Sequence, residues 1–179
     1  MIAVFLADGF EEIEALTAVD LLRRAELNVV TFGVGTDAPV GSHGIAVKAD
    51  KTEDQLDLQM LSAVVLPGGM PGTLHLEKSD AVQRAVSYAM EQKLPVAAIC
   101  AAPSILGHAG YLQGLHATCY PGFEDALDGA IYEEGGVVTD GIVTTAAGAG
   151  VAIDFALELV RRLASVAVAE EIRRSIQCR

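Results

Sequence analysis

Short apolar runs alternate with segments of helical periodicity along almost the whole chain. Strands are predicted at residues 1–7, Leu27 to Gly33, Leu61 to Leu66, Pro95 to Ile99 and Ile142 to Thr145, and Pro95 to Ile99 is apolar at every position. A run that is apolar at every position is typical of a strand covered on both faces, and helical segments between such strands indicate βαβ units. The order predicts an α/β fold with a mostly parallel sheet, and the length of 179 residues suits one domain over 1–179.

The segments between the strands carry helix and turn signals. Ser79 is a predicted N-cap, and Pro103 suits a first helical turn because the missing N–H has no helical partner there. Residues 34–50 predict a small β excursion, and Gly135-Gly136 a hairpin. Helices are also predicted from Glu11 to Ala25, from Ser79 through Gln92 and from Ala101 onward. After the Gly148-Ala149-Gly150 turn, a long helix is predicted from Val151 to Leu163, followed by a terminal helix to about Ile176. A short strand is predicted near His116 to Tyr120.

The composition excludes several classes of protein. Hydrophobic residues make up 51% of the chain and charged residues 20%, which is typical of globular proteins. The net charge of −12 repels phosphate groups, so we expect neither a nucleic-acid nor an anionic-membrane partner. No run suits a membrane helix of ~18–20 apolar residues, and residues 1–7 indicate a buried strand rather than a signal peptide. Three cysteines without CxxC pairs predict free thiols, no metal site and a cytoplasmic location.

Cys100 lies where a predicted buried strand meets a helix. Small residues stand two before and two after it, Ala98 and Ala102, as in the sharp turn called a nucleophile elbow. Such a turn predicts a strained backbone at the cysteine. The helix N-terminus predicts a depressed thiol pKa and therefore a reactive thiolate. The alternative is a cysteine that only packs in the core, because Cys is among the most buried residue types.

Two further stretches are predicted to reach the same edge of the sheet, because sites in open α/β sheets lie at the carboxyl ends of the strands. In Leu66-Pro67-Gly68-Gly69-Met70-Pro71-Gly72, the glycines allow backbone N–H groups to approach an oxyanion, although Gly-Gly also suits a plain turn. In Asp8-Gly9-Phe10-Glu11-Glu12-Ile13-Glu14, the first two glutamates suit the first turn of a helix, where acids interact favourably with the helix dipole.

Glu14 does not fit that explanation. Helical spacing places it at the head of an apolar column of Ala18, Leu21 and Ala25. A carboxyl group on an apolar column is expected to have a raised pKa, and in its protonated form it can donate a hydrogen bond to a thiolate. The residues alone therefore predict a reactive cysteine assisted by a carboxyl group.

These motifs together resemble the ThiJ/PfpI superfamily, in the branch of the Parkinsonism-associated deglycase ("DJ-one"). The resemblance extends over almost the whole chain. It implies a flavodoxin-like three-layer α/β/α sandwich of the class I glutamine amidotransferase type, and a homodimer. The motifs that carry it are Gly9-x-Glu11-Glu12-x-Glu14, Asp20-x-x-Arg23-Arg24-Ala25, Leu66-Pro67-Gly68-Gly69, Ala97-Ala98-Ile99-Cys100-Ala101-x-Pro103 and Phe155-Ala156-Leu157.

The resemblance also implies roles for residues. Cys100 would be the nucleophile and a redox-active thiol that is readily oxidised to sulfinate, with Glu14 as the protonated glutamate beside it. Gly69 and Ala101, with Gly68, would supply backbone N–H groups facing the sulfur. Members are described as glyoxalases that act on methylglyoxal without glutathione, as deglycases that act on early glycation adducts, and as chaperones. Some are peptidases, and an older assignment is thiazole monophosphate synthesis in the thiamine pathway. No cofactor is implied.

Three positions depart from the family pattern. Tyr120 stands where many members have a histidine, and a phenol with a pKa of ~10 is a poor base at neutral pH, although it can donate a hydrogen bond. Ala101 stands where peptidase-like members have a histidine after the cysteine. Ala147 stands where a near relative has an arginine that helps hold an oxidised cysteine or an anion. The departures argue against a Cys–His dyad and against an anion clamp.

Other nucleophiles and bases are weaker candidates. Cys119, beside Tyr120, is predicted near the pocket, either as a small apolar filler, which is favoured, or as a resolving thiol for oxidised Cys100. Cys178 lies in the terminal segment and is interpreted as incidental. No histidine of this chain is a strong candidate for a catalytic base, although a dimer partner could contribute one. His43 and His75 are expected in loop or turn regions, His108 in the helix after Cys100 and His116 at the start of a strand.

The leading hypothesis is an enzyme that acts on a small carbonyl substrate or on a glycated protein. The Cys100 thiolate would attack the aldehyde of a dicarbonyl, Glu14 would move a proton, and backbone N–H groups would hold the oxyanion. The second hypothesis is a non-enzymatic sensor of oxidative stress, or a chaperone, whose output is the sulfinate of Cys100. A third is a peptidase or amidase, which the missing adjacent histidine disfavours.

Overall fold

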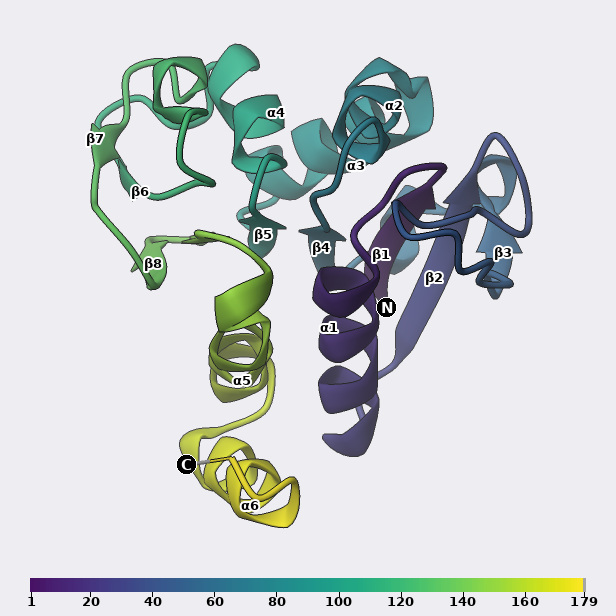
Figure 1. Cartoon of the computed structure of the whole chain (residues 1–179), viewed down its shortest axis with the longest axis vertical. Coiled ribbons are helices and arrows are strands. Elements are labelled where there is room, and N and C mark those ends of the chain that lie inside the picture. Colours follow the sequence, from purple (N-terminus) through teal and green to yellow (C-terminus); the bar gives the residue numbers. More distant parts are fainter. Residues whose placement is uncertain (179) are drawn as a thin grey trace.

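The computed structural model describes residues 1–178, which are built around a seven-stranded sheet (Figure 1). The strand order is β3-β2-β1-β4-β5-β9-β8, and every pair is parallel except β8 with β9. The predicted mostly parallel sheet is therefore confirmed. The strands are β1 (Ile2–Ala7), β2 (Val29–Val34), β3 (Lys51–Thr52), β4 (Ala63–Leu66), β5 (Val96–Ile99), β8 (Val137–Asp140) and β9 (Val143–Ala146), and β6 (His116–Ala117) pairs separately with β7 (Ile131–Tyr132).

Six α-helices of the described residues cover the sheet. They are α1 (Glu12–Arg24), α2 (Gly72–Lys78), α3 (Asp80–Glu91), α4 (Pro103–His108), α5 (Ala152–Leu163) and α6 (Val166–Ser175). Ser79 caps α3 as predicted, because its side chain accepts a hydrogen bond from the N–H of Val82 at 3.3 Å. Within residues 1–178, no helix combines the length and the apolar character that a membrane crossing requires.

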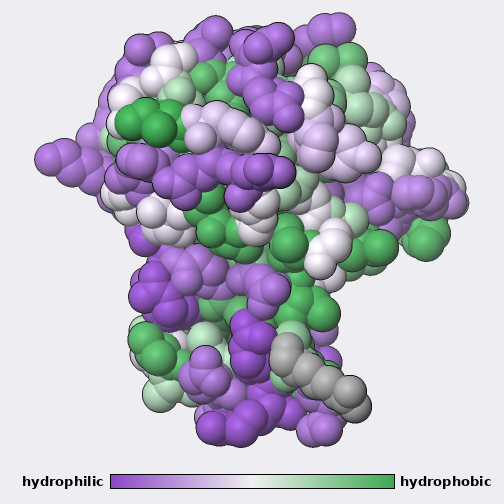
Figure 2. Space-filling model, turned by 60° about the vertical axis from the view of Figure 1, so that its left-hand side comes forward, coloured by the Kyte–Doolittle hydropathy of each residue, from purple (hydrophilic) through white to green (hydrophobic). Residues whose placement is uncertain are grey.

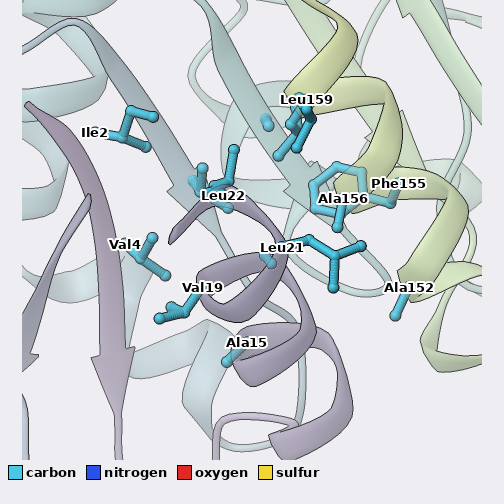
Figure 3. Close-up of a cluster of buried hydrophobic side chains, with 14 of the residues drawn as sticks. Ile2, Val4, Ala15, Val19, Leu21, Leu22, Ala152, Phe155, Ala156 and Leu159 are labelled. Atoms are coloured by element: carbon cyan, nitrogen blue, oxygen red, sulfur yellow. The ribbon is translucent and has the colours of Figure 1, made fainter. Parts of the chain in front are cut away.

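The strands bury both faces, which produces two cores. Along β1, side chains alternate between the faces. Ile2, Val4 and Leu6 pack with α1, α5 and α6, whereas Ala3 and Phe5 pack on the other side with α2, α3 and α4. Figure 3 shows the first core, where α1 and α5 lie side by side and their apolar side chains meet. The arrangement confirms the predicted flavodoxin-like three-layer α/β/α sandwich.

Polar residues cover most of the outer surface in the view of Figure 2, and hydrophobic side chains gather in smaller groups between them. The hydrophobic share of 51% is therefore largely explained by the two cores, since β1, β4, β5 and β9 are buried at every position.

Three sequence-based expectations about connections were wrong. The hairpin lies not at Gly135-Gly136 but at Gly141, between β8 and β9, where Asp140 pairs with Val143. The pair Asp140-Gly141 is a stronger hairpin signal than Gly135-Gly136, which follows two glutamates, and the sequence-based prediction did not use it. Residues 34–50 form one isolated bridge, Val40 to Ala46, rather than a β excursion of paired strands. His75 lies in α2, a helix that the sequence analysis missed, and not in a turn.

Candidate functional site

Cys100 follows β5 directly and occupies a left-handed backbone conformation, with φ of 66°. A residue with a Cβ rarely adopts such a conformation, which costs on the order of 1–3 kcal/mol and persists only where surrounding contacts fix it. Two contacts do so here. The Cys100 N–H donates to the carbonyl of Ala146 at 2.8 Å, and its carbonyl accepts from the N–H of Tyr120 at 2.8 Å. The predicted strained elbow is confirmed.

The loop after β4 packs directly against this elbow. The Gly68 N–H donates to Oε2 of Glu14 at 2.9 Å, and the Gly68 carbonyl accepts from the N–H of Glu11 at 2.9 Å. A Cβ at Gly68 would lie 2.6 Å from Cβ of Cys100 and 2.7 Å from Oε2 of Glu14. The glycine is therefore required for the close approach of α1, the loop after β4 and the elbow after β5. These segments meet at one edge of the sheet, beside the point where the strand order reverses.

Glu14 connects α1 to the elbow. The residue is 1% exposed, and its carboxyl packs beside Cys100, because a Cβ at Gly68 would lie 2.7 Å from Oε2 of Glu14 and 2.6 Å from Cβ of Cys100. Burial raises the pKa of the Glu14 carboxyl to about 7, although the hydrogen bonds from Cys100 and Gly68 act in the opposite direction. The raised pKa confirms the expectation drawn from the apolar column, since Ala18 and Leu21 are buried beneath it. Its Oε1 atom is buried and has no hydrogen-bond partner among residues 1–178.

The Cys100 thiol has a raised pKa, not the depressed one that the sequence predicted. Burial and the charge of Glu14 raise its pKa to about 12, while the backbone N–H groups of Gly69 and Ala101 lower it by a smaller amount. The following helix cannot reverse this effect, because α4 begins only at Pro103 and has six residues. The prediction failed because it counted the helix terminus and left out the neighbouring carboxylate.

The pair can still supply a thiolate by an internal proton transfer, although the thiol pKa of about 12 holds the proton on sulfur more strongly than the carboxyl pKa of about 7 holds it on Glu14. Below the lower pKa of about 7 both groups are protonated, and above it the pair holds one shared proton and one negative charge. Transfer of that proton from sulfur to the carboxylate leaves a thiolate beside a carboxylic acid, a form of higher free energy because the thiol has the higher pKa. The thiolate would then face the N–H groups of Gly69 and Ala101. The arrangement can supply a nucleophile, a proton carrier and two donors for an oxyanion.

Tyr120, Ala147 and Gly148 lie beside this pair. The ring of Tyr120 is close to Gly148, since a Cβ there would be 3.3 Å from Cδ2 of the ring and 4.0 Å from Oε1 of Glu14. Tyr120 is half exposed, at 50%. Ala147 follows the residue that accepts the Cys100 N–H. The structure thus places the half-exposed Tyr120 ring against Gly148, near the Glu14 carboxyl.

The other two cysteines belong to different parts of the fold. Cys119 is buried in the core on the α3 and α4 side, whereas Cys100 packs against the core on the α1 and α5 side. Its thiol pKa is raised to about 11 by burial and by Glu124, with no contribution from Cys100. This placement favours the apolar filler over the resolving thiol. Cys178 lies near Arg173, whose Nη1 is 3.5 Å from the sulfur.

Three of the four histidines pair with groups away from the Cys100 sulfur. Nδ1 of His75 contacts the carbonyl of Asp8 at 2.8 Å. Nδ1 of His108 is 2.6 Å from Glu77, and Nδ1 of His116 is 2.5 Å from Glu133. Among residues 1–178, the side-chain partners that shift the pKa of Cys100 include Glu14 but no histidine. The structure therefore gives no support to an intrachain Cys–His dyad.

A polar cluster of Glu11, Glu12, Ser42 and His43 lies next to the site and was missed by sequence reasoning. Nδ1 of His43 is 3.0 Å from Oε2 of Glu12, and the His43 N–H donates to Oε1 of Glu12 at 2.8 Å. Burial raises the pKa of Glu12, but the hydrogen bonds from His43 and from the backbone outweigh it and lower the pKa to about 2. These contacts hold the loop of residues 40–46 at the N-terminus of α1.

This cluster predicts an acid sensitivity that depends on His43. A carboxyl whose pKa falls on folding stabilises the protein above its unfolded value, and that contribution is lost as pH falls from about 4.5 to about 2. We expect His43→Ala to shift the acid-unfolding midpoint to higher pH, measured by circular dichroism. The control is His108→Ala, which breaks the pair with Glu77, a glutamate more exposed than Glu12, and should shift the midpoint less. Equal midpoints for the two variants would contradict the assignment.

Comparisons with known proteins agree with this geometry. A sequence model described as the DJ-1/PfpI family matches residues 1–162. The chain is 35% identical over 175 residues to the Parkinson disease protein 7 homolog of Danio rerio, covering 95% of this chain and 93% of that protein. It is 36% identical over 141 residues to a protein named Deglycase from Pyrococcus horikoshii, covering 75% and 82% of the two chains.

Solved structures show the same fold. The structure titled Toxoplasma gondii DJ-1, oxidized, matches with a TM-score of 0.94 and 35% identity, covering 98% of this chain and 97% of that one. Some relatives are longer: the chain spans 37% and 42% of the length of Protein DJ-1 homologs B and A of Arabidopsis thaliana.

Proposed function

This chain belongs to the DJ-1/PfpI family, and from that premise we propose that it is a cysteine-dependent enzyme that acts on methylglyoxal or on early glycation adducts without glutathione. The observation that carries the proposal is the placement of the buried Glu14 carboxyl against the left-handed Cys100 elbow, where one carbon added at Gly68 would meet both groups. The N–H groups of Gly69 and Ala101 act on the same thiol and lower its pKa. The name Deglycase of the Pyrococcus horikoshii relative supports the same class of reaction.

The reaction follows from these groups. Proton transfer to Glu14 produces the Cys100 thiolate, which forms a carbon–sulfur bond at the aldehyde carbon of methylglyoxal. The N–H groups of Gly69 and Ala101 hold the oxyanion, which then takes the proton from Glu14. The Glu14 carboxylate next moves a proton from that carbon to the neighbouring ketone carbon by way of the enediol, which gives a lactoyl thioester. Water cleaves the carbon–sulfur bond, releasing lactate and restoring the thiol.

The direct test follows both reactant and product. Purified protein in a buffer free of amines and thiols should consume methylglyoxal and release an equal amount of lactate without glutathione. The buffer matters because dicarbonyls react reversibly with amines and thiols, which lowers the free substrate without turnover. Loss of methylglyoxal with no lactate would overturn the glyoxalase reading. Lactoyl or hemithioacetal adducts on a model peptide then test the deglycase reading in the same way.

Glu14→Gln tests the carboxyl as a proton carrier. The amide keeps the shape and can still accept from Gly68, but it cannot exchange a proton with sulfur, so we expect kcat to fall by ~10²–10³-fold. In the wild type, kcat/KM should rise with pH through about 7, where the pair loses its first proton, and the variant should lack this step. An unchanged pH profile in Glu14→Gln would contradict the role.

The same substitution has an expected effect on stability. The folded protein holds the Glu14 proton up to about pH 7, whereas the ordinary carboxyl pKa is 4.5, so the folded state binds more protons between these values. Stability due to this group therefore falls as pH rises from about 4.5 to about 7. Glu14→Gln should remove this pH dependence of stability and be at least as stable as the wild type above neutral pH. A loss of activity in this variant would then not be due to unfolding.

A second candidate function is a redox sensor or chaperone, favoured by the half-buried thiol and the two N–H groups that would hold sulfinate oxygens. The match to a DJ-1 structure described as oxidized supports it. Mild peroxide should add the mass of two oxygen atoms at Cys100, mapped by peptide mass spectrometry. Failure to form this species would remove the candidate. A peptidase is disfavoured, since Ala101 offers no base beside the sulfur.

The proposed partners are a small carbonyl compound or a glycated protein, and a second copy of the chain. The proposed location is the cytoplasm. Sedimentation at several concentrations tests the dimer.

A further inference from the structure

Glu11 is a charged side chain close to the reactive pair, and the mechanism above gives it no role. It is the N-cap residue of α1 and stands about one helical turn before Glu14. Its negative charge raises the pKa of Glu14. The Glu11 side chain is 15% exposed, so water screens this charge less than it would at an open surface. Glu11 therefore acts on the proton that Glu14 and Cys100 share.

The backbone of Glu11 is fixed against the loop after β4. Its N–H donates to the carbonyl of Gly68 at 2.9 Å, and the N–H of Gly68 donates to Oε2 of Glu14 at 2.9 Å. A Cβ at Gly69 would overlap the backbone nitrogen of Glu11. Glu11 and Glu14 therefore belong to one packed unit, and their backbones cannot separate without breaking these contacts.

His43 brings a charge of the opposite sign to Glu11. Nδ1 of His43 is 3.6 Å from Oε2 of Glu11, which also accepts from Oγ of Ser42 at 3.0 Å. The hydrogen bond with Glu12 and the charge of Glu11 raise the pKa of His43 above its ordinary value of 6.5. The imidazolium therefore persists to higher pH than in a free histidine, and it partly neutralises the Glu11 carboxylate.

The charges that act on Glu14 and on His43 come from α1 and from the elbow after β5. They are those of Glu11, Glu12 and Cys100. Two more titratable groups, on the segments after β1 and β6, contribute to neither pKa within the described residues, namely Asp8 and Tyr120. Glu11 is thus the charge that acts on both Glu14 and His43.

We propose that Glu11 and His43 are positioning residues of opposite sign for the proton of the Glu14–Cys100 pair: the Glu11 carboxylate retains this proton, and the His43 imidazolium favours its release. The loop of residues 40–46 thereby helps to set the pH at which the thiol becomes reactive. This concerns the regulation of the site described above and rests on the proposed function, because loss of this proton is the step that makes the pair reactive.

The proton is followed through the reactivity of the thiol, without turnover. Iodoacetamide alkylates Cys100, and the rate is measured by peptide mass spectrometry on both sides of the pH of about 7 at which the pair loses its first proton. Glu11→Gln keeps the shape and removes a negative charge, so the midpoint of the rise in rate should move about half a pH unit lower. Below the midpoint this is a ~3-fold faster reaction.

His43→Gln removes a positive charge and should move the midpoint in the other direction. The expected shift is smaller, about a few tenths of a pH unit or a ~2-fold slower reaction below the midpoint, because His43 is 69% exposed and water screens its charge. His43→Arg keeps a cation and should restore the wild-type midpoint, whereas a purely structural role of the imidazole would not be restored.

The matched controls are Glu77→Gln and His108→Gln. These residues form the same kind of pair between α2 and α4, with Nδ1 of His108 2.6 Å from the Glu77 carboxylate, and they should leave the midpoint unchanged. Any result other than shifts of opposite sign in Glu11→Gln and His43→Gln would overturn the proposal. A shift in His43→Gln that His43→Arg does not reverse would overturn it as well.

Turnover separates this proposal from the proposed function. If no lactate is formed but the two alkylation midpoints move in opposite directions, the proposed function fails and the roles of Glu11 and His43 stand. If lactate is formed but the midpoints do not move in this way, the roles of Glu11 and His43 fail and the proposed function stands.

Discussion

Cys100→Ser should reduce lactate formation from methylglyoxal at least ~10³-fold, the largest effect of any single substitution that leaves the fold intact. A serine hydroxyl is slightly smaller than a thiol and fits the same place, but it does not ionise in this pair and is a weak nucleophile without a strong base. Glu14 is a carboxyl with a pKa of about 7, which cannot hold the proton of an alcohol. Lactate is measured after a fixed time, with methylglyoxal followed in parallel.

The matched controls are Cys119→Ser and Cys178→Ser. Cys178 lies on α6's C-terminal side, and its replacement should leave the rate unchanged within about twofold. Cys119 is buried, so its replacement should cost some stability while activity at a permissive temperature is retained. Lactate formation by Cys100→Ser at the wild-type rate would exclude covalent catalysis by this thiol. A decrease caused equally by Cys119→Ser would point to a dithiol mechanism, against the separation of the two thiols in different cores.

Gly68→Ala has the second-largest expected effect, because one methyl group would overlap three segments at once. Its Cβ would lie 2.6 Å from Cβ of Cys100, 2.7 Å from Oε2 of Glu14 and 2.8 Å from the carbonyl of Ile99. None of these atoms is the far end of a mobile side chain, except the carboxylate itself. We expect a loss of stability of ~1–3 kcal/mol from overpacking and nearly complete loss of activity, since the added methyl group must push Glu14 and Cys100 apart.

Gly150→Ala is the control, because a Cβ at Gly150 meets no atom within 4 Å. Its stability should match the wild type to within a few tenths of a kcal/mol or increase slightly. Denaturant unfolding gives both stabilities, and the alkylation rate of Cys100 reports on the site. If Gly68→Ala kept wild-type activity and stability, the close packing of the β4 loop on the elbow would be wrong.

The sequence alone was sufficient for features that depend on near neighbours in the chain. Apolar runs predicted the buried strands, and the period of three to four residues predicted α1 and placed Glu14 on its buried face. Small residues around Cys100 predicted the strained elbow that the φ of 66° shows. Each inference holds because backbone geometry repeats over a few residues, so side-chain size and polarity reveal which positions are buried.

The tertiary structure decided the features that depend on distance through space. The hydrogen bond from Gly68 to Glu14 joins groups 54 residues apart, and the Glu12–His43 cluster joins groups 31 apart. The pKa of Cys100 illustrates the difference: the local pattern of a helix terminus predicted a fall, whereas burial and the carboxyl brought in by α1 raise it. Coulomb energy and desolvation depend on three-dimensional position, not on sequence separation. The cysteine at the turn was therefore predictable from its neighbours, whereas its protonation was determined by the folding of distant segments around it.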